Sequence, residues 1–251
     1  MKKIIVLLVC VIASMITYGQ NKMQNVMVNI EGIEVAPPQF TGIENVATLI
    51  STDKSQLIKN YLRKNAVYPE SAARCMKEGT EVIQFTVTSA GKVTNLKVIN
   101  SVCSEIDREV ISVLESTDGM WKPGYNNGNL VDMEQEVSLV FAADDYRNLQ
   151  KHFTKVATRY FVLGNKKMYL SKNPKKALRH YNHGIRYLPY DKSLLFVRGL
   201  CKYELGDEEG GREDWNRIAE LGGIDFGDFN DLTFDFEKMK GYSEMAEILG
   251  K

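Results

Sequence analysis

The sequence predicts an α+β fold, in which a three-stranded antiparallel sheet with two packed helices precedes an all-α helical-repeat domain. Two observations carry this prediction. Three segments alternate apolar and polar residues with a period of two, as half-buried strands do, and they are Thr80–Thr88, Val93–Asn100 and Gln135–Ala142. From Asp144 onward the strand patterns stop, and apolar residues recur at helical spacing instead.

The N-terminus has the pattern of a secretory signal. Lys2 and Lys3 precede an apolar run at 4–16, and small or polar residues follow it. We expect residues 1–19 to be a signal peptide that is cleaved after Gly19. The apolar run is shorter than the roughly 20 residues that span a bilayer, so a periplasmic protein is expected. An uncleaved inner-membrane anchor and a lipid anchor at Cys10 are the alternatives.

Charge and cysteine content limit the possible ligands. Without the signal, 30 Lys and Arg (32 less two) face 32 Asp and Glu, so no overall basic charge favours nucleic acid. The three remaining cysteines, Cys75, Cys103 and Cys201, match no zinc motif, and no metal is expected. In an oxidising compartment Cys75 and Cys103 are a candidate disulfide, since both lie at helix ends. The alternative is two small buried residues.

Residues 20–37 form a short lead-in with one alternating stretch, closed by Pro37-Pro38. The sheet domain then runs over 38–143. Its first helical segment is Gln56–Lys77, where Leu57, Ile58, Tyr61 and Leu62 have helical spacing. The pattern is interrupted near Tyr68 and Pro69, because the residue before a proline disfavours the helical conformation.

Local signals predict how the next elements begin and end. Pro69 suits the first turn of a second helical segment, and Gly79 suits a left-handed cap at the end of that segment. The stretch 89–92 (SAGK) supplies the turn between the first two strands. Ser104 or Asp107 can cap the following helix, whose inner face carries Ile106, Val110, Ile111 and Leu114.

The last part of this domain is a corner followed by a strand. Trp121–Gly124 breaks the chain, and the Asn-Asn-Gly sequence at 126–128 turns it toward the final strand. On the first strand, Ile83, Phe85 and Val87 share one face with Glu81. As the first residue on that face, Glu81 is expected at the rim of the sheet.

The order helix, strand, turn, strand, helix, Trp-x-Pro corner and strand resembles the C-terminal domain of TonB-type energy transducers. The resemblance covers about Pro38–Ala142, and the residues that carry it are Tyr68, Pro69, Gly79, Gly91, Trp121 and Pro123. Glu81 departs from it, because that family usually has an apolar residue there. A complete transducer is not expected, because the chain lacks a long Pro-rich spacer.

The resemblance implies partner binding by β-augmentation, in which an extended segment pairs with an exposed strand edge. The expected edge is the last strand, and its residues are Gln135, Glu136, Val137, Ser138, Leu139, Val140 and Phe141. Gln135 and Ser138 would face outward, while Val137, Leu139 and Phe141 hold the strand to the helices. The expected partner is a TonB-dependent outer-membrane receptor or another envelope protein. The alternatives are an edge covered by the protein's own chain, and a structural adaptor or homodimer without energy transduction.

The second domain has an internal period. Ala177 and Gly211, like Tyr181 and Trp215, are 34 positions apart, and this period resembles that of tetratricopeptide repeats. The repeats are expected over 144–223, followed by an acidic tail, 224–251, with a capping helix at 236–249.

Three further expectations concern this second domain. Gly164 lies one residue too far from Ala177, so an insertion is expected in the inner loop. A separate helix over 146–159 is expected to add a layer. The domain either docks a second protein, or dimerises, or only stabilises the sheet domain.

Charge is distributed unevenly along this second domain. Residues 146–190 contain eleven Lys or Arg and no acidic residue, whereas 204–251 contain fourteen acidic and five basic residues. One interpretation is solvated helix faces whose fields partly cancel. The other is a basic surface for anionic lipid, glycan or an acidic partner.

No pattern in the sequence supports catalysis. The three histidines, His152, His180 and His183, all lie in the helical domain, away from the cysteines of the sheet domain. No Ser/His/Asp order, paired carboxylates or phosphate loop is visible. The sequence therefore predicts a binding protein, with no enzyme activity, cofactor, metal or nucleic-acid ligand, and with at most peripheral membrane contact.

Overall fold

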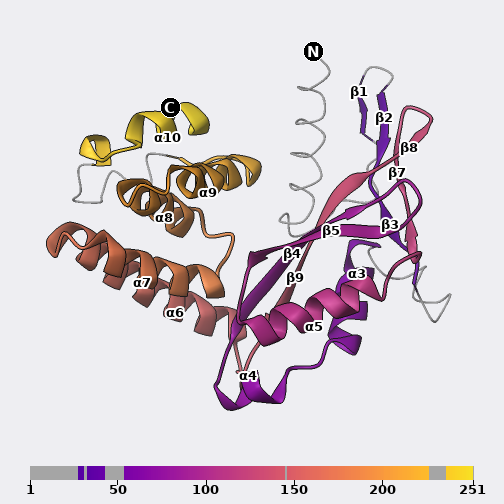
Figure 1. Cartoon of the computed structure of the whole chain (residues 1–251), viewed down its shortest axis with the longest axis horizontal. Coiled ribbons are helices and arrows are strands. Elements are labelled where there is room, and N and C mark those ends of the chain that lie inside the picture. The colour runs from indigo at the N-terminus through magenta and orange to yellow at the C-terminus, as the bar shows by residue number, and fades with distance from the viewer. Residues whose placement is uncertain (1–27, 31–32, 43–53, 145, 226–235, 251) are drawn as a thin grey trace. The chain divides into compact units, whose positions relative to one another are not determined.

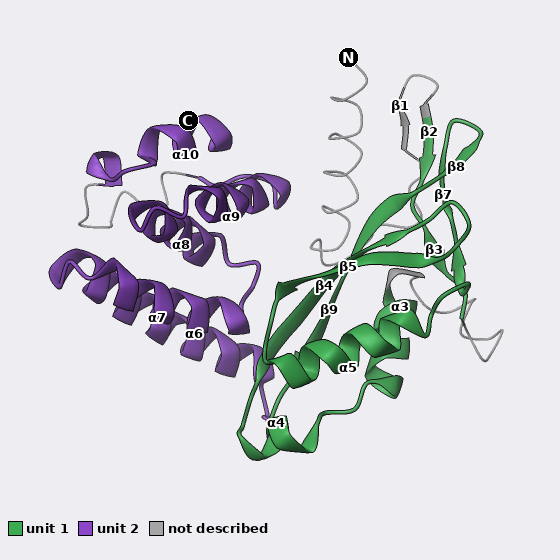
Figure 2. Ribbon diagram, viewed as in Figure 1, with its two compact units in different colours: residues 1–143 green, residues 144–251 purple. Residues whose placement is uncertain are grey.

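The structure is a computed structural model that describes residues 28–30, 33–42, 54–144, 146–225 and 236–250. The expected signal peptide, 1–19, lies outside the described residues. The chain divides into two compact units, residues 1–143 and 144–251 (Figure 2). Each unit has its own hydrophobic core.

The main sheet of the first unit is three-stranded and antiparallel, which confirms that part of the predicted fold (Figure 1). Its order is β5 (Val93–Asn100), β4 (Gly79–Val87) and β9 (Met133–Phe141). The central strand β4 is buried at most of its positions, as its apolar and β-branched composition predicts.

Two smaller antiparallel sheets were not predicted. One is two-stranded, and the other is four-stranded with the order β1-β2-β7-β8. Their strands are β1 (Val28–Ile30), β2 (Ile33–Ala36), β3 (Gln39–Phe40), β6 (Trp121–Lys122), β7 (Gly124–Asn126) and β8 (Asn129–Val131). The lead-in therefore pairs with the Trp-x-Pro corner, through β2 with β7 and β3 with β6. The lead-in has one alternating stretch, but strands of two to four residues do not reveal which segments they pair with.

The predicted turn at 126–128 joins β7 to β8. Asn127 and Gly128 have φ of 46° and 87°, as both central residues of a type I′ hairpin require. The same asparagine also reaches the lead-in. Its N–H donates to the carbonyl of Glu34, and its Oδ1 accepts from the N–H of Glu34, both at 2.8 Å. These two bonds tie the hairpin to β2.

The described residues of the first unit also form three helices: α3 (Lys54–Asn65), α4 (Glu70–Arg74) and α5 (Ser104–Glu115). Together with β4 and β9 they supply most of one apolar core. Its members from these elements are Leu57, Ile58, Leu62, Ala72, Ile83, Phe85, Val87, Ile106, Val110, Leu114, Val137, Leu139 and Phe141. The helices therefore cover one face of the main sheet, with α5 along it in Figure 1.

Three predicted helix ends were wrong. Pro69 is the N-cap of α4 and not inside its first turn. The left-handed cap is Met76, with φ of 47°, and its N–H and that of Lys77 donate back to the carbonyls of residues 73 and 72. That is the Schellman pattern, whereas Gly79 begins β4. Cys103 is the N-cap of α5, without a side-chain cap from Ser104 or Asp107.

In its described ranges the second unit consists of helices and the turns that join them, without strands. Its elements are α6 (Leu149–Asn165), the π-helix η1 (Lys166–Leu170), α7 (Pro174–Tyr187), α8 (Lys192–Glu204), α9 (Glu208–Glu220), the 3-10 helix η3 (Phe236–Lys238) and α10 (Tyr242–Leu249). The predicted separate helix at 146–159 is the start of α6. The predicted helix at 236–249 is broken, because Gly241 adopts φ of 78° between η3 and α10.

Small residues let the helices of each hairpin approach closely. A Cβ at Gly164 would lie 2.3 Å from the ring of Tyr181, and a Cβ at Gly199 would lie 2.3 Å from Nε1 of Trp215. The hairpins α6–α7 and α8–α9 thus repeat one packing arrangement, a glycine on the first helix against an aromatic ring on the second. Their relation to tetratricopeptide repeats stays a prediction.

The extra residue in the first hairpin is accommodated in a helix rather than in a loop. The π-helix η1 continues directly from α6 over Lys166–Leu170. A π turn contains more residues than an α turn, so it absorbs a single inserted residue without moving the helix that follows. The insertion predicted between Gly164 and Ala177 is therefore placed at the end of α6.

We expect Gly199→Ala to lower the free energy of unfolding of the helical unit by about 1–3 kcal/mol, because the new methyl group collides with the fully buried ring of Trp215. Hydrogen exchange of α8 and α9 in denaturant measures the change, because fluorescence would also report Trp121 of the first unit. Ser193→Ala, which adds no atom to the same helix, is the control and should have a smaller effect. Equal stability of Gly199→Ala and wild type would contradict the packing described above.

Candidate functional site: the edge of strand β9

Strand β9 lies at one end of the main sheet. All nine of its residues align with β4, from Phe141 opposite Gly79 to Met133 opposite Val87. In the part of the chain that the structure describes, no other strand pairs with β9. In an antiparallel edge strand, alternate residues direct their N–H and C=O groups away from the partner strand. The edge extends for about 30 Å, because each residue adds about 3.4 Å.

The core-facing side of β9 agrees with the prediction at three positions. Val137, Leu139 and Phe141 are 4–5% exposed and belong to the core. Gln135 was assigned wrongly, because it lies two positions before Val137 and opposite Phe85, and therefore on the core-facing side. Ser138 lies on the opposite side.

The other side of β9 is the one that α3 and α5 leave uncovered. It carries Glu134, Glu136, Ser138 and Val140, which are exposed or half-buried, and Val140 is 46% exposed. Across the sheet, Gln84 lies opposite Glu136 on one flank and Lys97 on the other. A partner on this side would meet a mixed polar row and one exposed aliphatic side chain.

One carbonyl near the start of β9 already has a side-chain partner. Nε2 of Gln135 donates to the carbonyl oxygen of Glu134 at 2.6 Å. An incoming segment would have to displace this amide to pair there. The stretch from Glu136 to Phe141 is therefore the part of the predicted edge that is best suited to pairing.

The Tyr-Pro motif supports the C-terminal end of β9. The ring of Tyr68 meets that of Phe141 edge-on at 5.6 Å, and its hydroxyl donates to the carbonyl of Lys77 at 2.8 Å. Burial, followed by the charge of Glu78, raises the pKa of Tyr68 above its ordinary value, which keeps the hydroxyl a donor. The N–H of Val67 donates to Oε1 of Glu109 on α5 at 2.8 Å.

The Trp-x-Pro corner supports the other end of the sheet. The ring of Trp121 meets Phe85 at 5.4 Å, and its Nε1 donates to Oγ1 of buried Thr117 at 3.0 Å. Gly91 has φ of 76°, and a Cβ there would lie 2.5 Å from the carbonyl oxygen of Trp121. Pro123 lies between β6 and β7 and has no N–H to donate. These motif residues shape the sheet and take no part in its free edge.

Glu81 is a second position that was predicted wrongly from the sequence. It is 1% exposed and not at a rim. Its Oε2 accepts from the N–H of Val102 at 2.9 Å, while Oε1 is buried without a hydrogen-bond partner. Burial raises the pKa of this carboxyl to about 8, and the nearby Asp107 adds to the shift. The carboxyl is therefore largely protonated at neutral pH. The sequence signal for this burial was the position of Glu81 on an otherwise apolar strand face.

The candidate disulfide is not formed in the structure. Cys75 and Cys103 are both free thiols, the first exposed and the second half-buried, and Cys201 is a buried thiol. Burial raises the pKa of Cys103 and Cys201, the latter to about 12, so neither is an activated thiolate. Within the described ranges, no group of three or more His, Cys, Asp or Glu side chains could hold a metal ion.

Among the described helices, none combines the length and the apolar character that crossing a bilayer requires.

Comparisons with known proteins show what the first unit is similar to. The family model of the Gram-negative bacterial TonB protein C-terminal matches residues 64–142, which confirms the resemblance for that stretch. Two solution structures of the Helicobacter pylori TonB C-terminal domain are similar at 17% identity. One covers 38% of this chain and all of its own, with a TM-score of 0.30, and the other 42% and 96%, with 0.31. No curated protein matches the chain.

Proposed function

We propose that this protein is an exported envelope interaction protein whose first unit binds an extended protein segment at β9 by β-augmentation. The match of residues 64–142 to the TonB C-terminal family supports a TonB-like envelope protein that acts without catalysis. The segment would come from a TonB-dependent outer-membrane receptor or another envelope partner. The signal peptide proposed at 1–19 would direct the chain to the periplasm.

The observation that carries the proposal is that β9 pairs with β4 over nine residues and, among the described residues, with no other strand. Main-chain hydrogen bonds to such an edge provide affinity without a specialised pocket. The alternating pattern adds selectivity, since Val137, Leu139 and Phe141 keep the strand on the core while Ser138 and Val140 remain accessible on the other side.

The second unit would dock a second protein. Its two equivalent helical hairpins and the additional helix α10 support this part of the proposal, because stacked hairpins present continuous surfaces that recognise other chains. In this arrangement the two units would bring two partners together.

Hydrogen exchange of the full chain tests the edge directly. The probe is a set of synthetic peptides with the N-terminal sequences of outer-membrane receptors. We expect a binding peptide to slow exchange about tenfold or more at alternate amides of β9, because these gain main-chain acceptors. The other edge strand, β5, is the internal control and should not change. Protection of β5 alone, or no protection anywhere, would contradict the proposal.

A matched pair of variants tests the side-chain contribution. Val140→Ser should weaken peptide binding about threefold to tenfold, because an accessible aliphatic contact on β9 is lost. Val67→Ser removes a side chain that is 66% exposed outside the sheet and should leave affinity unchanged. Isothermal titration measures both affinities. A tight dimer that ignores every peptide, measured by solution mass, would instead favour the homodimeric adaptor.

A further inference from the structure

One side of helix α6, continued by the first residue of η1, is a basic stripe. Lys151, Lys155, Arg159 and Lys166 recur at intervals of four, four and seven residues and are all exposed. This spacing places them on one side of an α-helix. The buried residues of α6, which include Ala157 and Gly164, fall on the opposite side. The stripe therefore points away from the core of the helical unit.

Helix α7, the second helix of the same hairpin, adds further basic side chains. Lys175, Lys176 and Arg179 are exposed, while Ala177 and Tyr181 are buried against the neighbouring helices. The whole hairpin contains no acidic residue that could moderate this charge. The exposed Lys and Arg residues of α6, η1 and α7 are called the basic face below.

The basic face lacks counterions of its own. In the described part of the chain, none of Lys151, Lys155, Arg159, Lys166 or Lys175 makes an ion pair with a carboxylate. So many adjacent cations repel one another in the free protein. A polyanion that lies against the basic face offsets this repulsion, because it attracts each of the Lys and Arg side chains.

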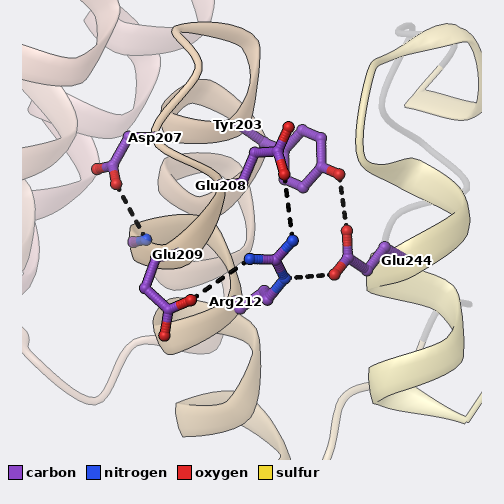
Figure 3. A network of polar contacts seen from close by, with 7 residues as sticks. Tyr203, Asp207, Glu208, Glu209, Arg212 and Glu244 are labelled. Atoms are coloured by element: carbon purple, nitrogen blue, oxygen red, sulfur yellow. Dashed lines mark hydrogen bonds and ion pairs between the residues drawn. The ribbon is translucent and has the colours of Figure 1, made fainter.

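The acidic half of the same unit is a weaker candidate for this polyanion. Arg212 pairs with Glu208 and Glu209 of α9 at 3.2 and 3.4 Å, and with Glu244 of α10 (Figure 3). Arg217 pairs with Glu220 at 3.2 Å. Glu208, Glu209, Glu220 and Glu244 therefore already have an arginine partner within α9 and α10. A second copy of the chain would have to give up these contacts for the same carboxylates to meet the basic face.

Two exposed aliphatic side chains favour a lipid surface over a soluble polyanion. Val162 lies in the stripe of α6 and is 58% exposed, and Leu170 ends η1 and is 72% exposed. Surrounded by cations, apolar side chains of this kind enter the boundary between headgroups and acyl chains while the Lys and Arg residues contact phosphates.

We propose that the basic face docks the helical unit on an anionic bilayer by contacts with lipid headgroup phosphates. Each Lys or Arg near such a surface contributes to binding, and the attraction falls off within a Debye length. The contact is peripheral and does not depend on the edge of β9. It would hold the protein at a membrane surface while the first unit remains free to bind its partner.

Sedimentation of the full chain with vesicles tests this proposal. The vesicles contain either phosphatidylcholine alone or phosphatidylcholine with phosphatidylglycerol, and any affinity of the N-terminal apolar run is common to both. We expect binding to be stronger with phosphatidylglycerol and to weaken as salt rises. The triple variant Lys155→Glu, Arg159→Glu, Lys166→Glu should lose about a hundredfold or more of this affinity.

A charge-matched variant distinguishes the effect of the basic face on vesicle binding from the effect of the protein's net charge. Arg63→Glu, Lys92→Glu, Lys122→Glu makes the same change at exposed positions of the first unit and should retain wild-type binding. Equal losses in the two triple variants, or no preference for phosphatidylglycerol in wild type, would overturn the proposal. So would salt-sensitive oligomers, formed without vesicles and abolished by the first triple variant, because a second copy would then occupy the face.

Discussion

Replacing Asp214 with alanine is expected to lower the free energy of unfolding of the helical unit by about 3–5 kcal/mol. The carboxylate is 5% exposed and accepts from Nε and Nη2 of Arg198 on α8 at 2.9 and 2.6 Å. Nζ of Lys202, one turn further on, lies 3.2 Å away. Without the carboxylate, two cations that are each only 17% exposed remain in a low-dielectric site with no anion.

The neighbouring Glu213 provides the control for this variant. It is exposed on the same helix, so Glu213→Ala should change stability by about 0.5 kcal/mol or less. Because the chain has two units, unfolding is best followed by hydrogen exchange of α8 and α9 separately from the sheet. Similar losses for Glu213→Ala and Asp214→Ala would show that the buried ion pair does not hold α8 to α9.

Glu81→Gln is expected to stabilise the first unit near neutral pH by about 2–3 kcal/mol, and to remove most of its pH dependence in the acidic to neutral range. The pKa of Glu81 rises from 4.5 to about 8 in the folded state. Below pH 4.5 Glu81 is protonated in both the folded and the unfolded state, so its favourable contribution to wild-type stability is fully present there. Between the two values only the folded state keeps the proton, and wild-type stability falls by about 1.4 kcal/mol per pH unit.

The amide of glutamine has nearly the shape of the neutral carboxyl and can still accept from Val102. Because glutamine does not ionise, a rise in pH cannot stabilise the unfolded state of this variant by deprotonation at position 81. Urea unfolding of wild type and Glu81→Gln across this pH range measures the difference between them. Glu134→Gln removes one carboxylate from an exposed position of β9, and as the control it should change stability by about 0.5 kcal/mol or less. Parallel curves for wild type and Glu81→Gln would show that the buried carboxyl is ionised in the folded state.

Local pattern predicted much of the main sheet. The alternation around Ile83, Phe85 and Val87 placed β4 to within a residue at each end, and Val93–Asn100 coincides with β5. Alternation works along the second half of β4, from Phe85 to Val87, because the helices bury one face there, whereas Thr80 and Val82 are buried on the other face as well. The last strand was also placed, although it begins two residues earlier, at Met133.

Other features of the site depend on contacts that are distant in sequence. Gly79 was predicted as the left-handed cap because glycine tolerates left-handed backbone. In the structure Met76 adopts that conformation, and Gly79 is already the first residue of β4. Gln135 was placed outward by its polarity, whereas the pleat of β9 puts it on the core-facing side. Polarity alone does not report which way a strand residue points.

The amino-acid sequence by itself determined the helices, the three long strands, the glycine–aromatic period of the second unit and the uneven charge, because each depends on neighbours close along the chain. Only the tertiary structure decided that β9 ends its sheet, that the lead-in pairs with the corner, and that Glu81 is buried. The pairing of short strands that are far apart in sequence depends on which surfaces meet when the whole unit packs. The burial of a single carboxyl depends on the same packing.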